Sequence, residues 1–117
     1  MSSNAQCLFC RIASGEIPSK KVFEDDQVVA FHDVTPQAPT HVLVIPRRHI
    51  PSLDDMSGDD VATIGETVLR LTKIARELGL DVDGYRVVVN NGPGAGQTVF
   101  HIHFHLVGGR QFGWPPG

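Results

Sequence analysis

Histidines alternate with apolar residues near the end of the sequence, in the order His101, Ile102, His103, Phe104, His105. In an extended strand successive side chains point to opposite faces, so the three histidines would share one face and the apolar residues the other. Three imidazoles on one face are costly to crowd without partners. The pattern therefore indicates a functional site rather than an ordinary structural strand.

Two kinds of chemistry suit a row of imidazoles, namely metal binding and nucleophilic catalysis. Same-face residues lie about 6.7 Å apart along a strand, so His101 and His105 would lie about 13 Å apart, and at most two of the three histidines should share one ion. A neutral imidazole can instead attack an electrophilic phosphorus. The central ring, His103, is best placed for such an attack, because its neighbours can orient it and supply protons.

A glycine-rich segment at residues 92–96 comes shortly before these histidines, and polar side chains flank it: Asn90, Asn91, Gln97 and Thr98. Backbone amides and polar side chains in such a segment can bind the non-bridging oxygens of a phosphate. The glycine spacing matches neither a P-loop nor a dinucleotide-binding fingerprint. Taken alone, the segment is either a phosphate cradle or a simple turn.

The hydropathy pattern predicts the elements that position these residues. Apolar residues recur at spacings of three and four, which indicates an amphipathic helix over roughly residues 58–78, with a capping box from Ser57 to Asp60 and a left-handed end at Gly79. The apolar cluster at residues 8–17 predicts a short helix that ends near Gly15. Segments rich in β-branched and aromatic residues predict five strands, at 20–24, 27–32, 41–45, 85–90 and 99–107. Strands grouped on either side of one long helix indicate an α+β fold with a mostly antiparallel sheet.

Length and charge exclude several classes of protein. A chain of 117 residues leaves room for one domain, which we expect to span residues 1–117. The 10 basic and 13 acidic residues give a net charge of −3 without a basic cluster, which disfavours binding to nucleic acid or to an acidic membrane. No apolar run approaches the ~20 residues of a transmembrane helix. Residues 1–6 lack the pattern of an export signal, so we expect a cytoplasmic protein with reduced cysteines.

The segment His101 to Val107 resembles the His-φ-His-φ-His-φ-φ signature of the histidine triad (HIT) superfamily of nucleotide hydrolases and transferases. The resemblance continues through residues 31–33, 36–41, 44–46, the glycine-rich segment and residues 108–111. The C-terminal sequence Trp114-Pro115-Pro116-Gly117 is most similar to the Hint branch, the histidine triad nucleotide-binding proteins that act as purine nucleoside phosphoramidases.

This resemblance implies a HIT-like fold with a five-stranded sheet, one long helix and one short helix. It implies a homodimer in which the two sheets join, with a C-terminal tail at about 108–117 that completes the dimer and the rim of the active site. It further implies hydrolysis of the P–N bond of purine nucleoside 5′-phosphoramidates, and of aminoacyl adenylates, to the nucleoside monophosphate through a covalent nucleotidyl-histidine. By the same resemblance, we expect the base to be a purine such as adenine or guanine, and the chemistry to require no cofactor.

The resemblance also assigns roles to single residues. His103 matches the nucleophile, His105 a phosphate-contacting residue, and His101 and His41 orienting or proton-relaying residues. Asp33 matches the carboxylate that accepts hydrogen bonds from the ribose hydroxyls. Two further groups match residues that contact the phosphate or leaving group and residues that enclose the purine: Asn90, Gln97 and Thr98 in the first, Phe9, Ile17, Phe31 and Val34 in the second.

The pair Cys7 and Cys10 forms a C-x-x-C motif, which is a redox pair, half of a zinc site or two ordinary buried thiols. Superfamily members with a similar pair hold a structural zinc ion with two histidines, and the matching positions here are His49 and His101. Two other functions remain open beside the phosphoramidase. One is a nucleotide-binding scaffold or regulatory module with incidental catalysis, and the other is a metallohydrolase built on the histidine strand.

Overall fold

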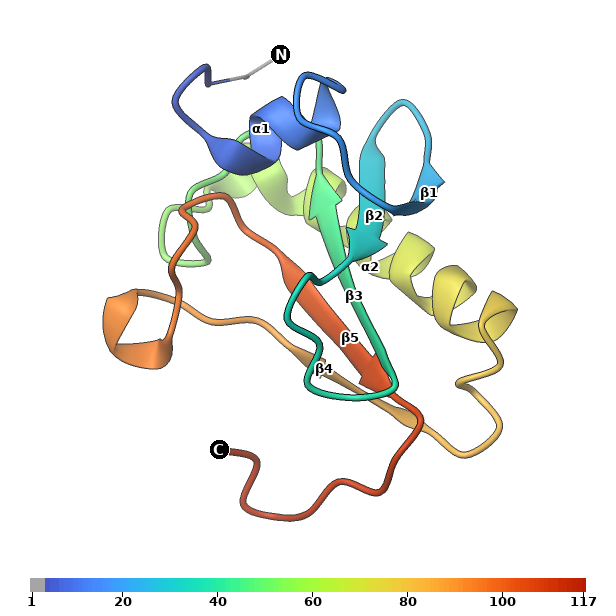
Figure 1. Ribbon diagram of the computed structural model, residues 1–117. Coiled ribbons are helices and arrows are strands. Elements are labelled where there is room, and N and C mark those ends of the chain that lie inside the picture. The colour runs from blue at the N-terminus through green and yellow to red at the C-terminus, as the bar shows by residue number, and fades with distance from the viewer. Residues whose placement is uncertain (1–3) are drawn as a thin grey trace.

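A computed structural model describes residues 4–117, which form one antiparallel sheet in the order β1-β2-β3-β5-β4 (Figure 1). The strands are β1 Lys21–Glu24, β2 Val28–His32, β3 Thr40–Pro46, β4 Tyr85–Val88 and β5 Phe104–Gly108, and the helices are α1 Leu8–Ala13 and α2 Val61–Glu77. The α+β class and the five-stranded sheet are therefore confirmed. Within residues 4–117, none of the helices combines the length and the hydrophobicity that a membrane span requires. The expectations that rest on residues 1–3 lie outside the described residues.

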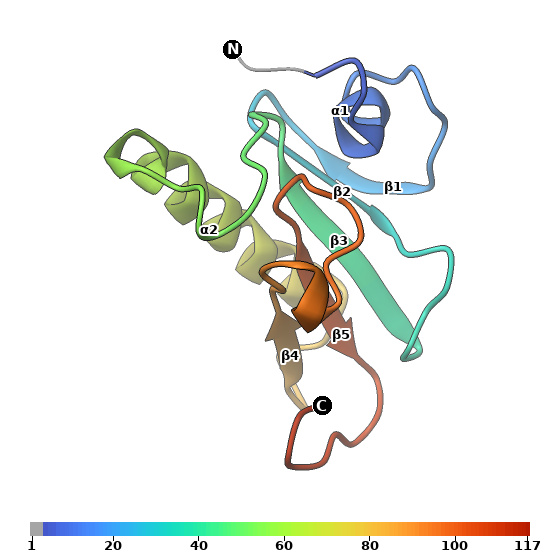
Figure 2. The same cartoon turned by 90° about the vertical axis from the view of Figure 1, so that its left-hand side faces the viewer.

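The two helices cover opposite faces of the sheet (Figure 2). Leu71 and Ile74 of α2 pack against Val42 and Val44 of β3, in a cluster that also holds Ile102 and the inward-facing residues of β5. The alternate residues of β2 and β3 face the other way and pack against α1 in a second cluster: Val29, Phe31, Leu43 and Ile45. The period-two alternation of the strands thus separates a core beneath α2 from a smaller one beneath α1.

The long helix begins and ends close to the positions predicted from the sequence. The side chains and backbone of Ser57 and Asp60 form the expected capping box, and residues Gly58–Asp60 make a 3-10 turn that leads into α2. After the last turn, Gly79 has a φ of 76°, the left-handed conformation that favours glycine. The short helix α1 ends at Ala13, with Ser14 as its C-cap, before Gly15, as expected.

The last strand is shorter than the predicted 99–107, and this expectation is corrected. In the register of β3 with β5, Val44 pairs with Phe104, so Pro46 would face Ile102 if the ladder continued. Proline has no N–H to donate to that ladder. The amide of Ile102 donates instead to the carbonyl oxygen of Ile50 in the loop after β3, at 2.7 Å. His101 and His103 therefore lie on an extended segment that leads into β5.

Candidate active site

The alternation of the histidine segment survives although only part of it is a strand. Ile102 lies in the core beneath α2, whereas the rings of His101 and His103 both lie edge-on to Phe9 of α1, with centroids 6.1 and 5.0 Å from it. The rings of His103 and His105 are 5.0 Å apart. The three histidines thus face the α1 side of the sheet, as the period of two predicts.

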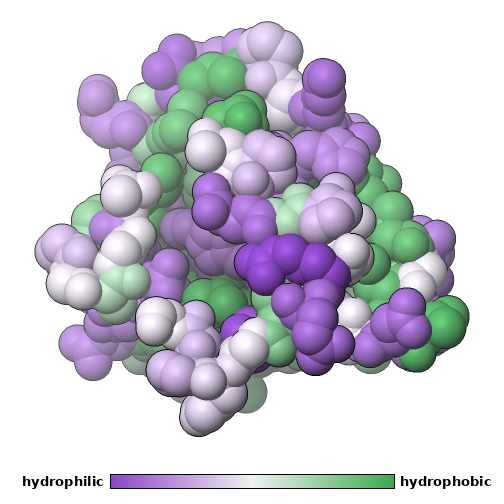
Figure 3. Space-filling model, turned by 60° about the horizontal axis from the view of Figure 1, so that its bottom comes forward, coloured by the Kyte–Doolittle hydropathy of each residue, from purple (hydrophilic) through white to green (hydrophobic). Residues whose placement is uncertain are grey.

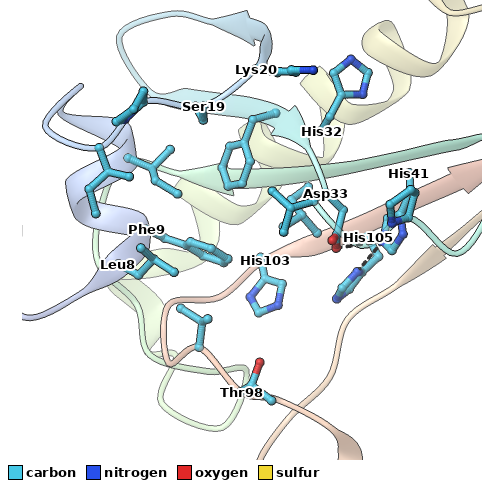
Figure 4. Close-up of a pocket in the computed structure, with 18 of the residues that line it drawn as sticks. Leu8, Phe9, Ser19, Lys20, His32, Asp33, His41, Thr98, His103 and His105 are labelled. Carbon is cyan, nitrogen blue, oxygen red and sulfur yellow. Dashed lines mark hydrogen bonds and ion pairs between the residues drawn. The ribbon is translucent and has the colours of Figure 1, made fainter.

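This side of the sheet opens into a cavity of about 1150 Å³ between α1, the segment before β1, the end of β2 and the residues that lead into β5 (Figure 4). Nine residues proposed from the sequence line it: Phe9, Ile17, Phe31, Asp33, Val34, His41, Thr98, His103 and His105. A cavity of this size holds a drug-sized or nucleotide-sized molecule.

His103 presents one ring nitrogen to this cavity. Its Nδ1 lies 2.8 Å from the carbonyl oxygen of His101, and a carbonyl only accepts, so Nδ1 carries the ring proton and donates it. Burial lowers the pKa of His103 below its usual value, which favours the neutral ring. The neutral ring then has its lone pair on Nε2, the atom available for nucleophilic attack.

His41 and His105 form a hydrogen-bonded pair whose tautomers follow from a backbone contact. The amide N–H of Gln37 donates to Nδ1 of His41 at 3.0 Å, so the neutral His41 ring carries its proton on Nε2. That nitrogen lies 2.9 Å from Nδ1 of His105, which accepts the proton (Figure 4). His105 therefore carries its own proton on Nε2. Burial lowers the pKa of His105 to about 4, so the ring is a neutral donor at pH 7.

Asp33 completes this group. One of its oxygens accepts from the amide of Thr35 at 2.8 Å, and the other lies 3.4 Å from Nε2 of His41. Asp33, His41 and His105 each have one possible metal-ligating atom, and these three atoms lie within 4.8 Å of one another, a spacing that also occurs in metal sites. Nε2 of His41 carries a proton, however, so it offers no lone pair to an ion in this tautomer. The arrangement is that of a hydrogen-bonding relay.

Of the polar residues near the glycine-rich segment that were expected at the phosphate, only one lines the cavity. Thr98 lines the cavity, and its hydroxyl lies on the side of the His103 ring (Figure 4). Gln97 is buried and does not line it: its side-chain amide donates to the carbonyl oxygens of Pro51 and Val99, and its oxygen accepts from the amide of Gly92. Gln97 therefore braces the segment. Asn90 follows β4 and also lies outside the cavity lining.

The apolar part of the cavity is built around Phe9 and Phe31, whose rings meet edge to face with centroids 5.5 Å apart. Val34, in contrast, is 96% exposed and lies at the rim. Lys20 and His32, which were not expected at the site, also line the cavity (Figure 4). His32 directly precedes Asp33 in the sequence, and this neighbourhood is the signal that could have indicated it.

A second cluster lies behind the histidine segment and joins Cys7, Cys10, His49 and His101, whose donor atoms all lie within 4.8 Å of one another. Nε2 of His101 lies 2.7 Å from the carbonyl oxygen of Pro46 and donates to it, which leaves the lone pair of Nδ1 facing the two thiols. Burial raises the pKa of the Cys10 thiol to about 11. The four residues proposed as metal ligands are thus brought together, and the group can hold a metal ion.

Comparison with known proteins agrees with this architecture. The HIT domain model matches residues 14–112. An uncharacterized HIT-like protein of Synechocystis sp., slr1234, is 48% identical over 110 residues, which cover 94% of this chain and 96% of the relative. The adenylylsulfatase HINT1 of Arabidopsis thaliana is 44% identical, with 98% of this chain and 79% of the relative covered.

Solved structures give the same result. The crystal structure of a HIT family hydrolase from Legionella pneumophila Philadelphia 1 has a TM-score of 0.93 and 52% identity, with 95% of this chain and 99% of that chain covered. The histidine triad nucleotide-binding protein of Candida albicans has a TM-score of 0.79 and 36% identity, with 95% and 84% covered. The protein therefore belongs to the HIT domain family.

Proposed function

We propose that the protein is a nucleotide hydrolase that cleaves the P–N bond of purine nucleoside 5′-phosphoramidates and releases the nucleoside monophosphate. The observation that carries the proposal is the orientation of His103, whose Nδ1 proton is engaged by His101 while Nε2 keeps its lone pair towards the cavity. Similarity to proteins named as HIT family hydrolases and as a nucleotide-binding protein supports this class of reaction.

The reaction would proceed in two displacements at the α-phosphorus. Nε2 of His103 forms a bond to phosphorus while the P–N bond to the leaving amine breaks, and the amine takes up a proton from solvent. Water then attacks the nucleotidyl-histidine and gives up a proton to solvent, the bond to Nε2 breaks, and the monophosphate leaves with Nε2 regaining its lone pair. The Nε2–H donor of His105 and the hydroxyl of Thr98, both at the cavity, would stabilise the phosphoryl oxygens during both steps.

The rest of the cavity suits a nucleoside. Phe9, Phe31 and the half-buried Ile17 offer apolar surface to the flat faces of a purine, and Val34 would cover it from the rim. Asp33 keeps an oxygen at the cavity, where a carboxylate can accept from both ribose hydroxyls. Asn90 and Gln97 would act less directly than expected, by shaping the glycine-rich segment rather than by contacting the phosphate.

We further propose a structural zinc ion at Cys7, Cys10, His49 and His101. With bond lengths of about 2.3 Å to sulfur and 2.05 Å to nitrogen, a tetrahedral zinc ion separates two nitrogens by about 3.3 Å, and a sulfur from a nitrogen by about 3.6 Å. Here the two Nδ1 atoms lie 3.3 Å apart, and three of the four S–N separations are 3.4, 3.4 and 3.5 Å. The ion would supply no catalytic chemistry and would tie α1 to the segment that carries His103.

We also propose that the protein forms a homodimer. β4 is an edge strand of the sheet, so the β4 strand of a second copy could extend it in a homodimer. Residues 1–117 would form the single domain, with the tail at about 108–117 completing the partner's active site. We expect this dimer to act in the cytoplasm. A nucleotide-binding scaffold is the alternative function, and it would use the same cavity without turnover.

The test is hydrolysis of an adenosine 5′-phosphoramidate with a fluorescent amine, in the presence of a chelator, by the wild type and by His103→Ala. Release by the wild type alone supports the proposal. Absence of release by the wild type, with nucleotide binding intact, supports the scaffold instead. Because one relative is named an adenylylsulfatase, adenylyl sulfate is a second compound to test, with release of AMP as the readout.

A further inference from the structure

The segment directly after β5 contacts the loop between β2 and β3 at two points. Gly109 has a φ of 93° and approaches Pro39 so closely that a Cβ atom at this position would lie 2.9 Å from the ring. The neighbouring Arg110 donates from Nε and Nη2 to the carbonyl oxygen of Gln37, at 3.2 and 3.1 Å. These contacts link positions 73 residues apart in the sequence.

Gln37, the residue that accepts from Arg110, also sets the tautomer of His41. Its carbonyl oxygen accepts from Arg110 on the outside of the loop, and its amide N–H donates to Nδ1 of the buried His41 ring on the inside. A short chain of hydrogen bonds therefore runs from the exposed guanidinium through one residue to His41 and on to His105.

We propose that Arg110 is a positioning residue, which holds the backbone of Gln37 where it keeps His41 in the Nε2–H tautomer that donates towards His105. Its role in turnover rests on the proposed function, whereas its effect on the His41 ring does not.

The loop is anchored at its start, where the amide of Asp33 donates to the carbonyl oxygen of His41. Residues 34–37 are exposed, and the hydrogen bonds there are local, from the amide of Thr35 to Asp33 and from the side chain of Gln37 to the carbonyl oxygen of Thr35. The contact with Arg110 therefore holds the exposed part of the loop. Without a fixed amide at Nδ1, the His41 ring can carry its proton on either nitrogen. A ring with the proton on Nδ1 would present a lone pair to the lone pair of His105 and break the pair.

Arg110 is itself held in place. Its guanidinium lies 4.3 Å from the centroid of the Phe112 ring, and Arg86 of β4 lies over the same ring at 5.2 Å and donates to the carbonyl oxygen of Gly113. This stack restricts the rotamers of Arg110 and directs its donors towards Gln37. The face of the molecule that Figure 3 shows carries strongly hydrophilic side chains near its middle, beside a hollow in the surface.

The test measures the ring nitrogen shifts of His41 by NMR on the full-length, ¹⁵N-labelled protein without substrate, since these shifts distinguish a protonated from an unprotonated nitrogen. The wild type should show a single Nε2–H tautomer, and Arg110→Ala should show a mixture of both. Arg110→Lys, which keeps one donor, should restore most of the wild-type signal. In the hydrolysis assay we expect kcat of Arg110→Ala to fall about 3- to 10-fold, equivalent to roughly 0.7–1.4 kcal/mol of barrier, with KM changed less than 2-fold.

Two controls separate this effect from a general loosening of the tail or the loop. Arg86→Ala removes the other half of the stack but no contact to Gln37, and Gln37→Ala keeps the backbone groups that carry the argument. Gln37→Ala should retain the wild-type His41 tautomer, and Arg86→Ala, which loosens the stack but keeps the donors of Arg110, should disturb it less than Arg110→Ala does. The inference is overturned if Arg110→Ala retains it as well, or if Arg86→Ala disturbs it equally. Absence of turnover in the wild type would count against the proposed function and leave the NMR result standing.

Discussion

His103 donates its Nδ1 proton to the backbone carbonyl of His101, at 2.8 Å, while the ring of His101 lies in the Cys/His cluster behind it. One residue thus belongs to both sites: its ring is a candidate metal ligand, and its carbonyl orients the proposed nucleophile. Anything that fixes the His101 ring also limits the movement of His103. This relationship connects the predicted metal site to catalysis without placing an ion near the substrate.

Removal of the metal should therefore lower the stability of the fold more than the rate of turnover. We expect purified protein to contain about one equivalent of zinc per chain. With free zinc at about 100 times its dissociation constant, binding would stabilise the fold by about 2.7 kcal/mol, which for a chain of this length corresponds to roughly 10 °C in the unfolding temperature. Calorimetry with and without chelator measures this shift.

Cys10→Ser is the matched variant for the zinc prediction, because it removes one ligand and keeps a similar volume. Its unfolding temperature should not respond to zinc, and the wild type should keep most of its turnover at 25 °C in chelator. Less than a tenth of an equivalent of zinc in the wild type, without uptake on titration, would remove the zinc proposal. Complete and immediate loss of turnover in chelator, with the fold intact, would favour a metallohydrolase.

Asp33→Asn should weaken substrate binding more than it slows the chemical step. The variant keeps the shape of the side chain but loses the charge that accepts from the ribose hydroxyls, so KM should rise about 10-fold, equivalent to ~1.4 kcal/mol, and kcat should change less. Asp26→Asn, on an exposed turn outside the cavity lining, is the control and should match the wild type. An unchanged KM for Asp33→Asn would contradict the assigned role.

Shortening an apolar side chain of the histidine segment should lower the stability of the fold. Ile102 is 1% exposed and packs in the core beneath α2, so Ile102→Ala should reduce the free energy of unfolding by about 2–5 kcal/mol. Val82→Ala, in the loop between α2 and β4, removes a side chain that is 82% exposed and should cost far less. Urea unfolding measures both. Equal effects of the two substitutions would contradict the assignment of Ile102 to the core side of the histidine segment.

His105 should make stability depend on pH. Its pKa is about 4 in the folded protein and ~6.5 when unfolded, so between these values the unfolded chain binds the proton and the folded chain does not. Above pH 6.5 both states are deprotonated and stability is unaffected. As the pH falls towards 4, the free energy of unfolding should decrease by at most about 1.4 kcal/mol per pH unit for this group.

The variant His105→Asn tests that assignment by urea unfolding at pH 7.5, 6 and 5. Its stability should fall less steeply below pH 6.5 than that of the wild type. His32→Asn, at the exposed end of β2, serves as the control and should keep the wild-type slope. The same slope in wild type and His105→Asn would contradict a His105 ring that stays neutral in the fold.

Much of the scaffold follows from local patterns in the sequence. The spacing of Leu71 and Ile74, the Ser57 capping box and Gly79 are local signals, and they placed α2 to within a few residues. The end of the last strand could not be placed in this way, because it depends on Pro46 in another strand. The alternation of the histidines was nevertheless sufficient to predict which rings share a face.

The site was only partly predictable for the same reason. Gln97 was expected at the phosphate, but its partners are backbone groups of Gly92, Pro51 and Val99, and sequence alone does not show which polar atoms a buried amide will meet. The contact of Arg110 with Gln37 joins two loops that no local pattern connects. The positions of His49 and His101 beside the cysteines were expected only because of the resemblance to the HIT family.

The most direct test of the account is detection of the covalent intermediate on His103. Chelator-treated wild type and His103→Ala are mixed with an adenosine 5′-phosphoramidate, quenched within the first turnovers and analysed by mass spectrometry of the peptide that holds residues 101–105. The account predicts a transient adenylyl mass on this peptide in the wild type, mapped to His103, and none in the variant. Amine release by His103→Ala at the wild-type rate, or an adenylyl group on another residue, would contradict it.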